Sequence, residues 1–225
     1  MSKITDYSFL FQSMFGTPKK SAIGSFQLSQ LNSGSVQAQL RAAGIDTNSA
    51  QYRAAIKEMM QNGNGAMYTN IQSIKNSMKC YDKDGDFINP RNGLAGLVLT
   101  DENAGRQKRI VSLPESSKDE MFEQTKIEFL RENGTLNGDT TRRRDVYDNL
   151  YRKMKKDDRL AAGYTMEQYE RAYRQAFLDA ARKADPKWEI GKPVPSGALD
   201  GITRESVEAN LRKSGRTLSS VDMKI

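Results

Sequence analysis

The sequence predicts a mainly α-helical protein: an irregular multi-helix domain with a short two-stranded β element in its middle. Two observations lead to this prediction. Apolar residues recur at helical spacing along most of the chain, which creates one apolar face per segment. Most of these segments also begin near a side chain that can accept hydrogen bonds from free helix amides, and end near a glycine.

The first half of the chain contains three segments of this kind. Ser35 is the expected cap of the first segment, and either Asn48 or Ser49 caps the second. We therefore expect short helices over residues 35–44, 48–63 and 67–79.

The second half contains longer helical segments. Ser117 with Glu120, and Thr165 with Gln168, have the spacing of capping boxes, in which two side chains satisfy each other's free backbone amides. The expected helices cover residues 117–134, 140–156, 165–184 and 203–213.

The middle of the chain has a different pattern. Residues 81–92 are dense in turn-forming residues, and they precede two short apolar runs at 97–99 and 109–113. Apolar runs bounded by turns are typical of strands, so we expect these two runs to pair as an antiparallel ribbon.

These elements suggest a division of the chain into four parts. Residues 1–15 form an amphipathic segment and residues 16–35 a polar linker rich in Gly, Ser and Gln. Residues 36–215 form a single mainly helical domain, with a sub-boundary left open at 81–115, and residues 216–225 are a tail. The first segment places Tyr7, Leu10, Phe11 and Met14 on one helical face, which makes these four residues candidates for docking to a partner. The alternative is that this face packs on its own domain.

Composition restricts the chemistry of the protein. The chain has no histidine and a single cysteine, Cys80. Histidine is the usual general base near neutral pH and the commonest metal ligand, so Ser-His-Asp sites and nearly all zinc sites are excluded. A lone thiol cannot form an internal disulfide. Chemistry based on carboxylates, Lys or Tyr stays open, but we expect a non-enzymatic protein without a cofactor.

The sequence has no apolar stretch long enough to span a bilayer and no secretory signal pattern. We therefore expect a cytoplasmic protein, and leave open export by a route independent of a signal peptide.

One motif suggests a metal ion. Asp82, Asp84 and Asp86 place carboxylates at alternating positions, as the first half of a calcium-binding EF-hand loop does. The match then fails, because Phe87 stands where the loop requires glycine. The alternative is an Asp-Gly turn whose carboxylates are solvated.

One stretch suggests nucleic acid. Residues 142–159 carry a local charge of +4, and an exposed basic face can bind phosphates. Acidic residues interrupt the stretch, which favours a solvated helix face stabilised by opposite charges four residues apart. The candidate nucleic-acid contacts are Arg142, Arg143, Arg144, Arg152, Lys153 and Lys156.

Aromatic residues suggest the core. Tyr164, Tyr169, Tyr173 and Phe177 recur at helical spacing and are expected to form a stripe of the core, with the Tyr hydroxyls near its rim. Trp188 follows in a loop rich in proline and glycine, and we expect it to pin that loop to the body of the domain.

Several segments together resemble a known family. They include YSFLFQSMFG near the start, GAMYTNIQSIKNSM and YDKDGDFINPRNGLAGL before the middle, and RLAAGYTMEQYERAYRQAF and LDGITRESVEANLRKSG in the second half. The chain is similar over most of its length to uncharacterised proteins from gut-dwelling Gram-positive anaerobes. These proteins share a domain of unknown function, so the resemblance implies no catalytic residue, ligand or partner.

Three hypotheses of function follow. The first is a non-enzymatic structural or protein-interaction component, whose partner is either a second copy or another protein. The second is a basic accessory protein that binds nucleic acid. The third is a calcium-binding interaction module.

Overall fold

The computed structural model describes residues 24–63, 65–101, 103–135, 138 and 140–213, with the side chains of 211–213 left out. The chain divides into two compact units, residues 1–99 and residues 100–225. This boundary falls inside the range 81–115.

Over its described residues, unit 1 consists of three helices and a small sheet. The helices are α2 (Gly34–Ala42), α3 (Ala50–Asn62) and α4 (Ile71–Met78). The strands β1 (Phe26–Gln27) and β2 (Tyr68–Thr69) pair antiparallel, with Phe26 opposite Thr69. A 3-10 turn at Leu28–Gln30 connects β1 to the segment that leads into α2. Together these elements enclose a core of buried side chains: Phe26, Leu28, Leu31, Val36, Leu40, Ile45, Tyr52, Met59 and Ile74.

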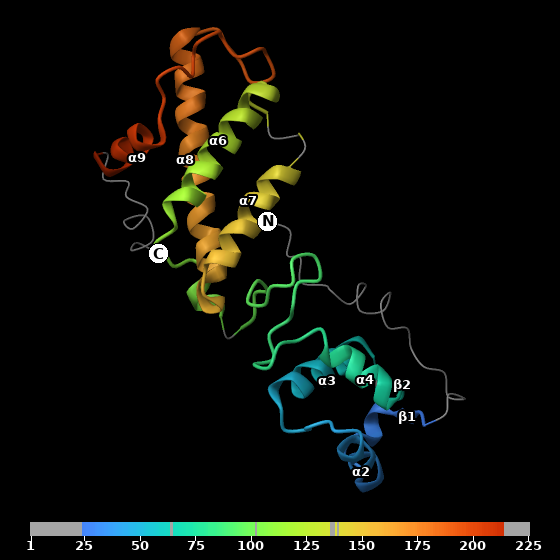
Figure 1. Ribbon diagram of the computed structural model, residues 1–225. Helices are drawn as coiled ribbons and strands as arrows, with labels where there is room; N and C mark the ends of the chain where they lie inside the picture. Colours follow the sequence, from blue (N-terminus) through green and yellow to red (C-terminus); the bar gives the residue numbers. More distant parts are fainter. Residues whose placement is uncertain (1–23, 64, 102, 136–137, 139, 214–225) are drawn as a thin grey trace. The chain divides into compact units, whose positions relative to one another are not determined.

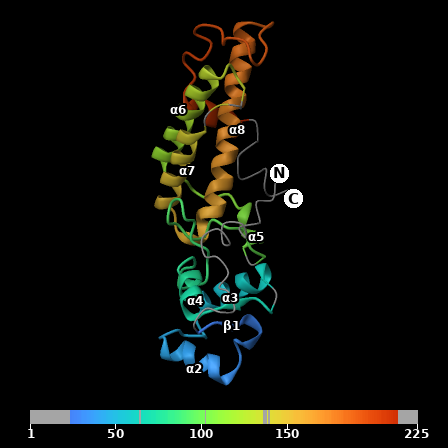
Figure 2. The ribbon, with the colours of Figure 1, turned by 90° about the vertical axis from the view of Figure 1, so that its right-hand side faces the viewer.

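Unit 2 is dominated by three helices, α6 (Glu115–Arg131), α7 (Thr141–Lys153) and α8 (Arg159–Ala184). They lie side by side in both views (Figure 1 and Figure 2). Contacts between residues 122 and 173, and between 129 and 177, show that α6 and α8 run in the same direction. The shorter helices α5 (Ala104–Gln107) and α9 (Arg204–Lys213) contact α8, and a 3-10 turn at Lys156–Asp158 precedes it.

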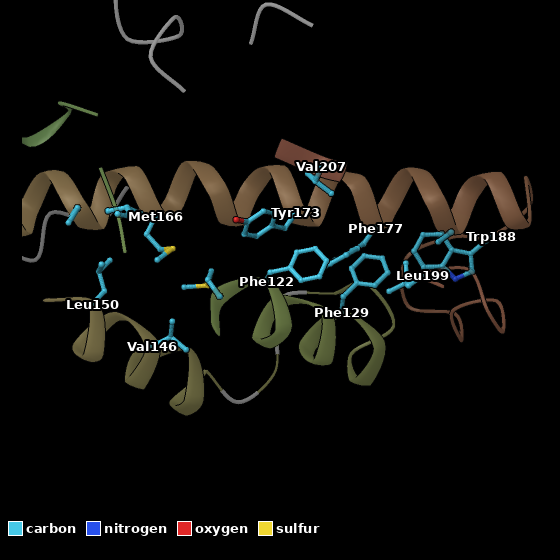
Figure 3. Close-up of a cluster of buried hydrophobic side chains, with 14 residues drawn as sticks. Phe122, Phe129, Val146, Leu150, Met166, Tyr173, Phe177, Trp188, Leu199 and Val207 are labelled. Atoms are coloured by element: carbon cyan, nitrogen blue, oxygen red, sulfur yellow. The ribbon is translucent and has the colours of Figure 1, made fainter. Parts of the chain in front are cut away.

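Aromatic rings form the centre of unit 2 (Figure 3). The Phe122 ring lies 5.2 Å from Tyr173 and 5.4 Å from Phe177, measured between centroids. Phe129 extends this chain of rings from Phe177 to Trp188, at 5.7 and 6.0 Å. Tyr173 and Phe177 are fully buried, and Trp188 is only 5% exposed. The expectation of an aromatic core face is therefore confirmed for Tyr173 and Phe177, and that of a pinned loop for Trp188, whereas Tyr164 and Tyr169 are only partly buried.

The mainly α fold and the presence of a two-stranded element are also confirmed, but the predicted strands were the wrong ones. The sheet uses residues 26–27 and 68–69, whereas 97–99 and 109–113 have no strand structure. The amide of Val111 instead donates to the hydroxyl of Thr165 on α8, at 3.1 Å. The second run is thus held by a helix side chain and not by a neighbouring strand.

The polar linker predicted for 16–35 was wrong for residues 24–35. Phe26, Leu28 and Leu31 are buried in the core of unit 1 despite their polar neighbours. These three apolar side chains determine the fold of the segment because each removes apolar surface from water.

Several helix starts also differ from the prediction. Ser33, not Ser35, caps α2. Both capping boxes were wrong: α6 begins after Pro114, and α8 begins at Arg159, six residues before Thr165. Thr165 lies inside α8, where its hydroxyl donates to the carbonyl of Ala161 at 2.8 Å. In contrast, Ser49 caps α3 as expected.

Among the described residues, no helix combines the length and the apolar character needed to cross a membrane.

Candidate functional site

A group of charged side chains and one tyrosine lies where α9 meets α6 and α8. We call it the ionic cluster, and it consists of Glu115, Lys118, Asp119, Tyr173, Arg204 and Glu208. Helical spacing explains its assembly, because the three α6 residues stand at positions i, i+3 and i+4, and Arg204 and Glu208 are four apart on α9. One face of α6 and one face of α9 are therefore occupied by side chains that make ionic contacts.

Arg204 is the centre of the cluster. Its guanidinium lies 2.7 Å from Glu115, 2.6 Å from Asp119 and 3.0 Å from Glu208. Two of these carboxylates belong to α6 and one to α9 itself. Arg204 therefore connects α9 to the first turns of α6 by charge-assisted contacts.

Lys118 makes the second ionic connection. Its ammonium group lies 2.7 Å from Glu115 and 3.4 Å from Glu208. It also lies 5.3 Å from the centre of the Tyr169 ring, within the range of a cation–π contact. Glu208 additionally accepts a hydrogen bond from the Tyr173 hydroxyl, at 2.9 Å.

The cluster is buried at its centre. Lys118 is 7% exposed and Glu208 is 5% exposed, which is rare for ionised groups unless they are paired. The hydrogen bond from Lys118 holds the pKa of Glu115 below its ordinary value, and the contact with Arg204 adds to this. Burial raises the pKa of Tyr173, and the neighbouring Glu208 raises it further, so Tyr173 stays a neutral donor.

A second network joins α6, α7 and α8. Arg143 on α7 forms ion pairs with Glu128 on α6 and with Glu170 on α8, the latter at 3.0 Å. Gln124 donates to Glu128 at 2.9 Å, and Tyr147 donates to Glu170 at 3.2 Å. Burial raises the pKa of Glu170 although Arg143 opposes this shift.

Both networks can therefore fix the positions of helices, because the buried carboxylates face cations or hydroxyl donors from other helices. Buried ion pairs of this kind contribute little net stability, but breaking one leaves an uncompensated charge.

The exposed side of α6 carries apolar residues. Ile127 is 47% exposed and Leu130 is 45% exposed, one helical turn apart. We call this pair the α6 surface. It is flanked by Glu123, Lys126 and Arg131. Ile190, 49% exposed, lies near the same end of α6, since the amide of Gly191 donates to the carbonyl of Asn133 at 2.7 Å.

The three predicted calcium ligands lie in a tight turn of unit 1. The Asp82 carboxylate accepts hydrogen bonds from the amides of Asp84 and Asp86, at 3.0 and 2.9 Å. Gly85 has φ +88°, and a Cβ there would lie 3.0 Å from the Ala50 carbonyl oxygen. In the part of the chain that the structure describes, no group of three or more acidic or cysteine side chains is placed to hold a metal ion. The structure thus gives Asp82 a turn-forming role, and calcium binding stays a prediction.

The residues predicted to contact nucleic acid lie in different environments in the structure. Arg143 is mostly buried in the second network. Arg142, Arg144, Arg152 and Lys153 are exposed on α7, and Lys153 donates to the hydroxyls of Ser116 and Ser117 on α6. Lys156 is partly buried in the 3-10 turn before α8. The predicted docking residues Tyr7, Leu10, Phe11 and Met14 lie outside the described residues.

Sequence reasoning missed the ionic cluster. Its members are common surface residues spread over three segments, and no local pattern separates a buried Lys118 from an exposed lysine. The only available signal was spacing: charged residues at i and i+4 in 115–119 and in 204–208.

Comparison with protein families then gives a clear result. A family model described as a domain of unknown function, DUF3879, matches residues 45–225. The chain belongs to this family. The match covers all of α3, α4 and unit 2, and it confirms the predicted kinship with a domain of unknown function. No curated protein and no solved structure matches the chain.

Proposed function

We propose that this DUF3879 protein is a non-enzymatic component that works through protein–protein contacts, and that the α6 surface is its contact with a second copy of the chain. The exposure of Ile127 and Leu130 on a helix whose other faces are packed is the observation that carries this proposal. Apolar side chains grouped on a polar surface are typical of interaction sites, although single ones are common.

The pattern of α6 supports a pairing of two α6 helices. Its exposed positions include 116, 120, 123, 127 and 130, which alternate in steps of four and three residues. This is the spacing of a coiled-coil seam. The seam is apolar only at its C-terminal end, so the expected contact is centred on Ile127 and Leu130.

Charge complementarity favours a second copy as the partner. An antiparallel pairing about a two-fold axis brings Glu123 of one chain toward Arg131 of the other, and the same contact occurs twice. Both side chains are exposed. Because few apolar side chains are buried, we expect weak association, with a Kd on the order of 0.1 mM.

Light scattering after size-exclusion chromatography tests this proposal. The average mass of the full chain is expected to rise with concentration, and Ile127→Glu/Leu130→Glu to abolish the rise. Met60→Glu is the matched control, because Met60 is similarly exposed on α3 of unit 1. A full chain that stays strictly monomeric up to about 0.5 mM, several times the expected Kd, contradicts the proposal.

The N-terminal segment is a second candidate contact for the same function. Deletion of residues 1–15 removes Tyr7, Leu10, Phe11 and Met14 together. If these residues take part in association, the deletion lowers the average mass as the α6 variant does, and an unchanged mass excludes them.

Nucleic-acid binding is the second candidate function, and the exposure of Arg142, Arg144 and Arg152 on α7 favours it. Binding through these side chains displaces counterions, so affinity must fall steeply as salt increases. Arg142→Ala/Arg152→Ala is expected to weaken binding to a fluorescent single-stranded DNA, with Arg171→Ala on α8 as control. Absence of binding at low salt removes this candidate.

A further inference from the structure

Over its described side chains, from Arg204 to Asn210, helix α9 is attached to the rest of unit 2 mainly by ionic contacts. Of its side chains from Arg204 to Asn210, only Val207 and Glu208 are buried. Val207 reaches the aromatic core, close to the level of Tyr173 (Figure 3). A single valine removes little apolar surface from water, so the apolar contribution of this part of the helix is small.

The ionic contacts contribute little net free energy to the docked state of α9. Arg204 and Glu208 are desolvated when α9 docks, and the attraction to Glu115, Asp119 and Lys118 is offset by this loss of hydration. In the released state the same charges are hydrated by water. Release of α9 is therefore expected to cost less free energy than unfolding of the aromatic core.

A short hinge allows release without unfolding of the aromatic core. Leu199 is buried and Trp188 is packed against Phe129, so the preceding connector is anchored. Gly201 follows Leu199 closely and has φ +75°, a conformation that L side chains rarely adopt. Ile202 is partly buried against the aromatic core, so a rotation at residues 200–201 moves Ile202 away from that core together with α9.

The surface beneath α9 is complementary to a specific pattern of side chains on a helix. We call it the α9 seat, and it consists of Glu115, Lys118, Asp119 and Tyr173. Two carboxylates receive the guanidinium of Arg204, and an ammonium and a hydroxyl receive the carboxylate of Glu208. Between these charges the seat accepts the side chain of Val207.

We propose that α9 is an exchangeable helix, and that its seat binds a partner helix that presents Arg, an apolar residue three positions later and Glu four positions later. Charge complementarity carries this choice of partner, because the seat presents two carboxylates to the Arg of the partner helix and an ammonium and a hydroxyl to its Glu. The inference rests on the proposed function, since it supplies a second protein contact, regulated by the resident α9.

A labelled peptide of residues 199–213 tests the exchange. Arg204→Glu in the full chain places a carboxylate against Glu115 and Asp119, and so weakens the resident helix. By fluorescence anisotropy, the peptide is expected to bind this variant at least ten-fold more tightly than the wild-type chain. Arg171→Glu on α8 is the matched control, and a peptide with Arg204 and Glu208 exchanged is the control ligand.

Equal binding of the peptide to the Arg204→Glu and Arg171→Glu chains, or to neither, overturns the inference. Equal binding of both peptides overturns it as well. The variant Ile127→Glu/Leu130→Glu leaves the seat intact, so failure of peptide binding is distinguishable from failure of self-association.

Hydrogen exchange of the wild-type chain gives a second test that needs no variant. Amides of residues 205–210 are expected to exchange at least ten-fold faster than those of residues 170–180 in α8. Raising NaCl from low to molar concentration increases their exchange further, because salt screens the ionic contacts. Protection of α9 equal to that of α8, unchanged by salt, overturns the inference.

Discussion

Arg204 of α9 and Glu115 of α6 form an ion pair, with 2.7 Å between the guanidinium and the carboxylate, although 89 residues separate them in the sequence. This ion pair lies at the edge of the ionic cluster. Asp119 and Glu208 complete the surroundings of Arg204, whose side chain is only 12% exposed. The last described helix thus depends on charges from the first helix of the bundle.

Removal of the guanidinium is expected to destabilise unit 2. Arg204→Met leaves Glu208 buried with fewer cations beside it, at a cost of about 1–3 kcal/mol in the free energy of unfolding. Urea denaturation followed by Trp188 fluorescence measures this change, since Trp188 is the one tryptophan of the chain.

Arg171→Met is the control for this substitution. Arg171 pairs with Glu167 on the exposed side of α8, where both side chains are about half exposed. Such surface ion pairs contribute little to stability, so we expect Arg171→Met to change the free energy of unfolding by no more than about 0.5 kcal/mol. Equal losses for the two variants contradict a special role for Arg204.

A methyl group at Gly134 is expected to disturb the end of α6. Gly134 has φ +77°, and an added Cβ would lie 2.9 Å from the Trp188 ring. Gly134→Ala therefore combines backbone strain with a clash, at a cost of roughly 1–3 kcal/mol. The wavelength of maximum Trp188 fluorescence is expected to shift, and the urea concentration at the midpoint of unfolding is expected to fall.

Gly105→Ala on α5 is the matched control, because nothing lies within 4 Å of the added Cβ and the backbone has no positive φ. We expect it to be neutral or slightly stabilising. Unfolding of Gly134→Ala at the wild-type midpoint argues against the packing of Trp188 described above.

The ionic cluster also predicts a pH dependence. The pKa of Glu115 is lower in the folded chain than its ordinary value of 4.5, chiefly because of the hydrogen bond from Lys118. The unfolded chain therefore binds this proton more readily than the folded one. The stabilisation is complete above pH 4.5 and is lost as the pH falls through the folded pKa.

Glu115→Gln replaces the titrating carboxyl group by an amide that does not titrate. Its free energy of unfolding is expected to fall less steeply between pH 5 and pH 3 than that of the wild type, in urea titrations at each pH. The effect is small because the Glu115 side chain is 66% exposed. Identical slopes for the two proteins contradict the contribution of Glu115.

The helices could be predicted from sequence because their signals are local. Tyr173 and Phe177 stand one turn apart, and Ser49 caps α3 by a hydrogen bond to an amide three residues later. Such relations are contained in a few consecutive residues. Kinship with a domain of unknown function was likewise accessible, since it rests on sequence segments.

The errors arose where distant residues decide the local structure. Thr165 has the sequence signature of a cap, but its hydroxyl bonds Ala161 and Val111 inside a longer helix. Phe26 lies in a polar segment, yet it pairs with β2, more than forty residues later, and is buried in a core built from several distant elements. The burial of Lys118 and Glu208 depends on contact between α6 and α9, which no single segment reveals.

Disulfide cross-linking tests the central claim, self-association through the α6 surface, most directly. In a Cys80→Ser background, Ile127→Cys is expected to form a covalent dimer on mild oxidation, because the antiparallel pairing that brings Glu123 toward Arg131 places the two 127 positions opposite each other. Met60→Cys, of similar exposure in unit 1, is expected to stay monomeric. If Ile127→Cys forms no more dimer than Met60→Cys, the α6 surface is not the contact between copies.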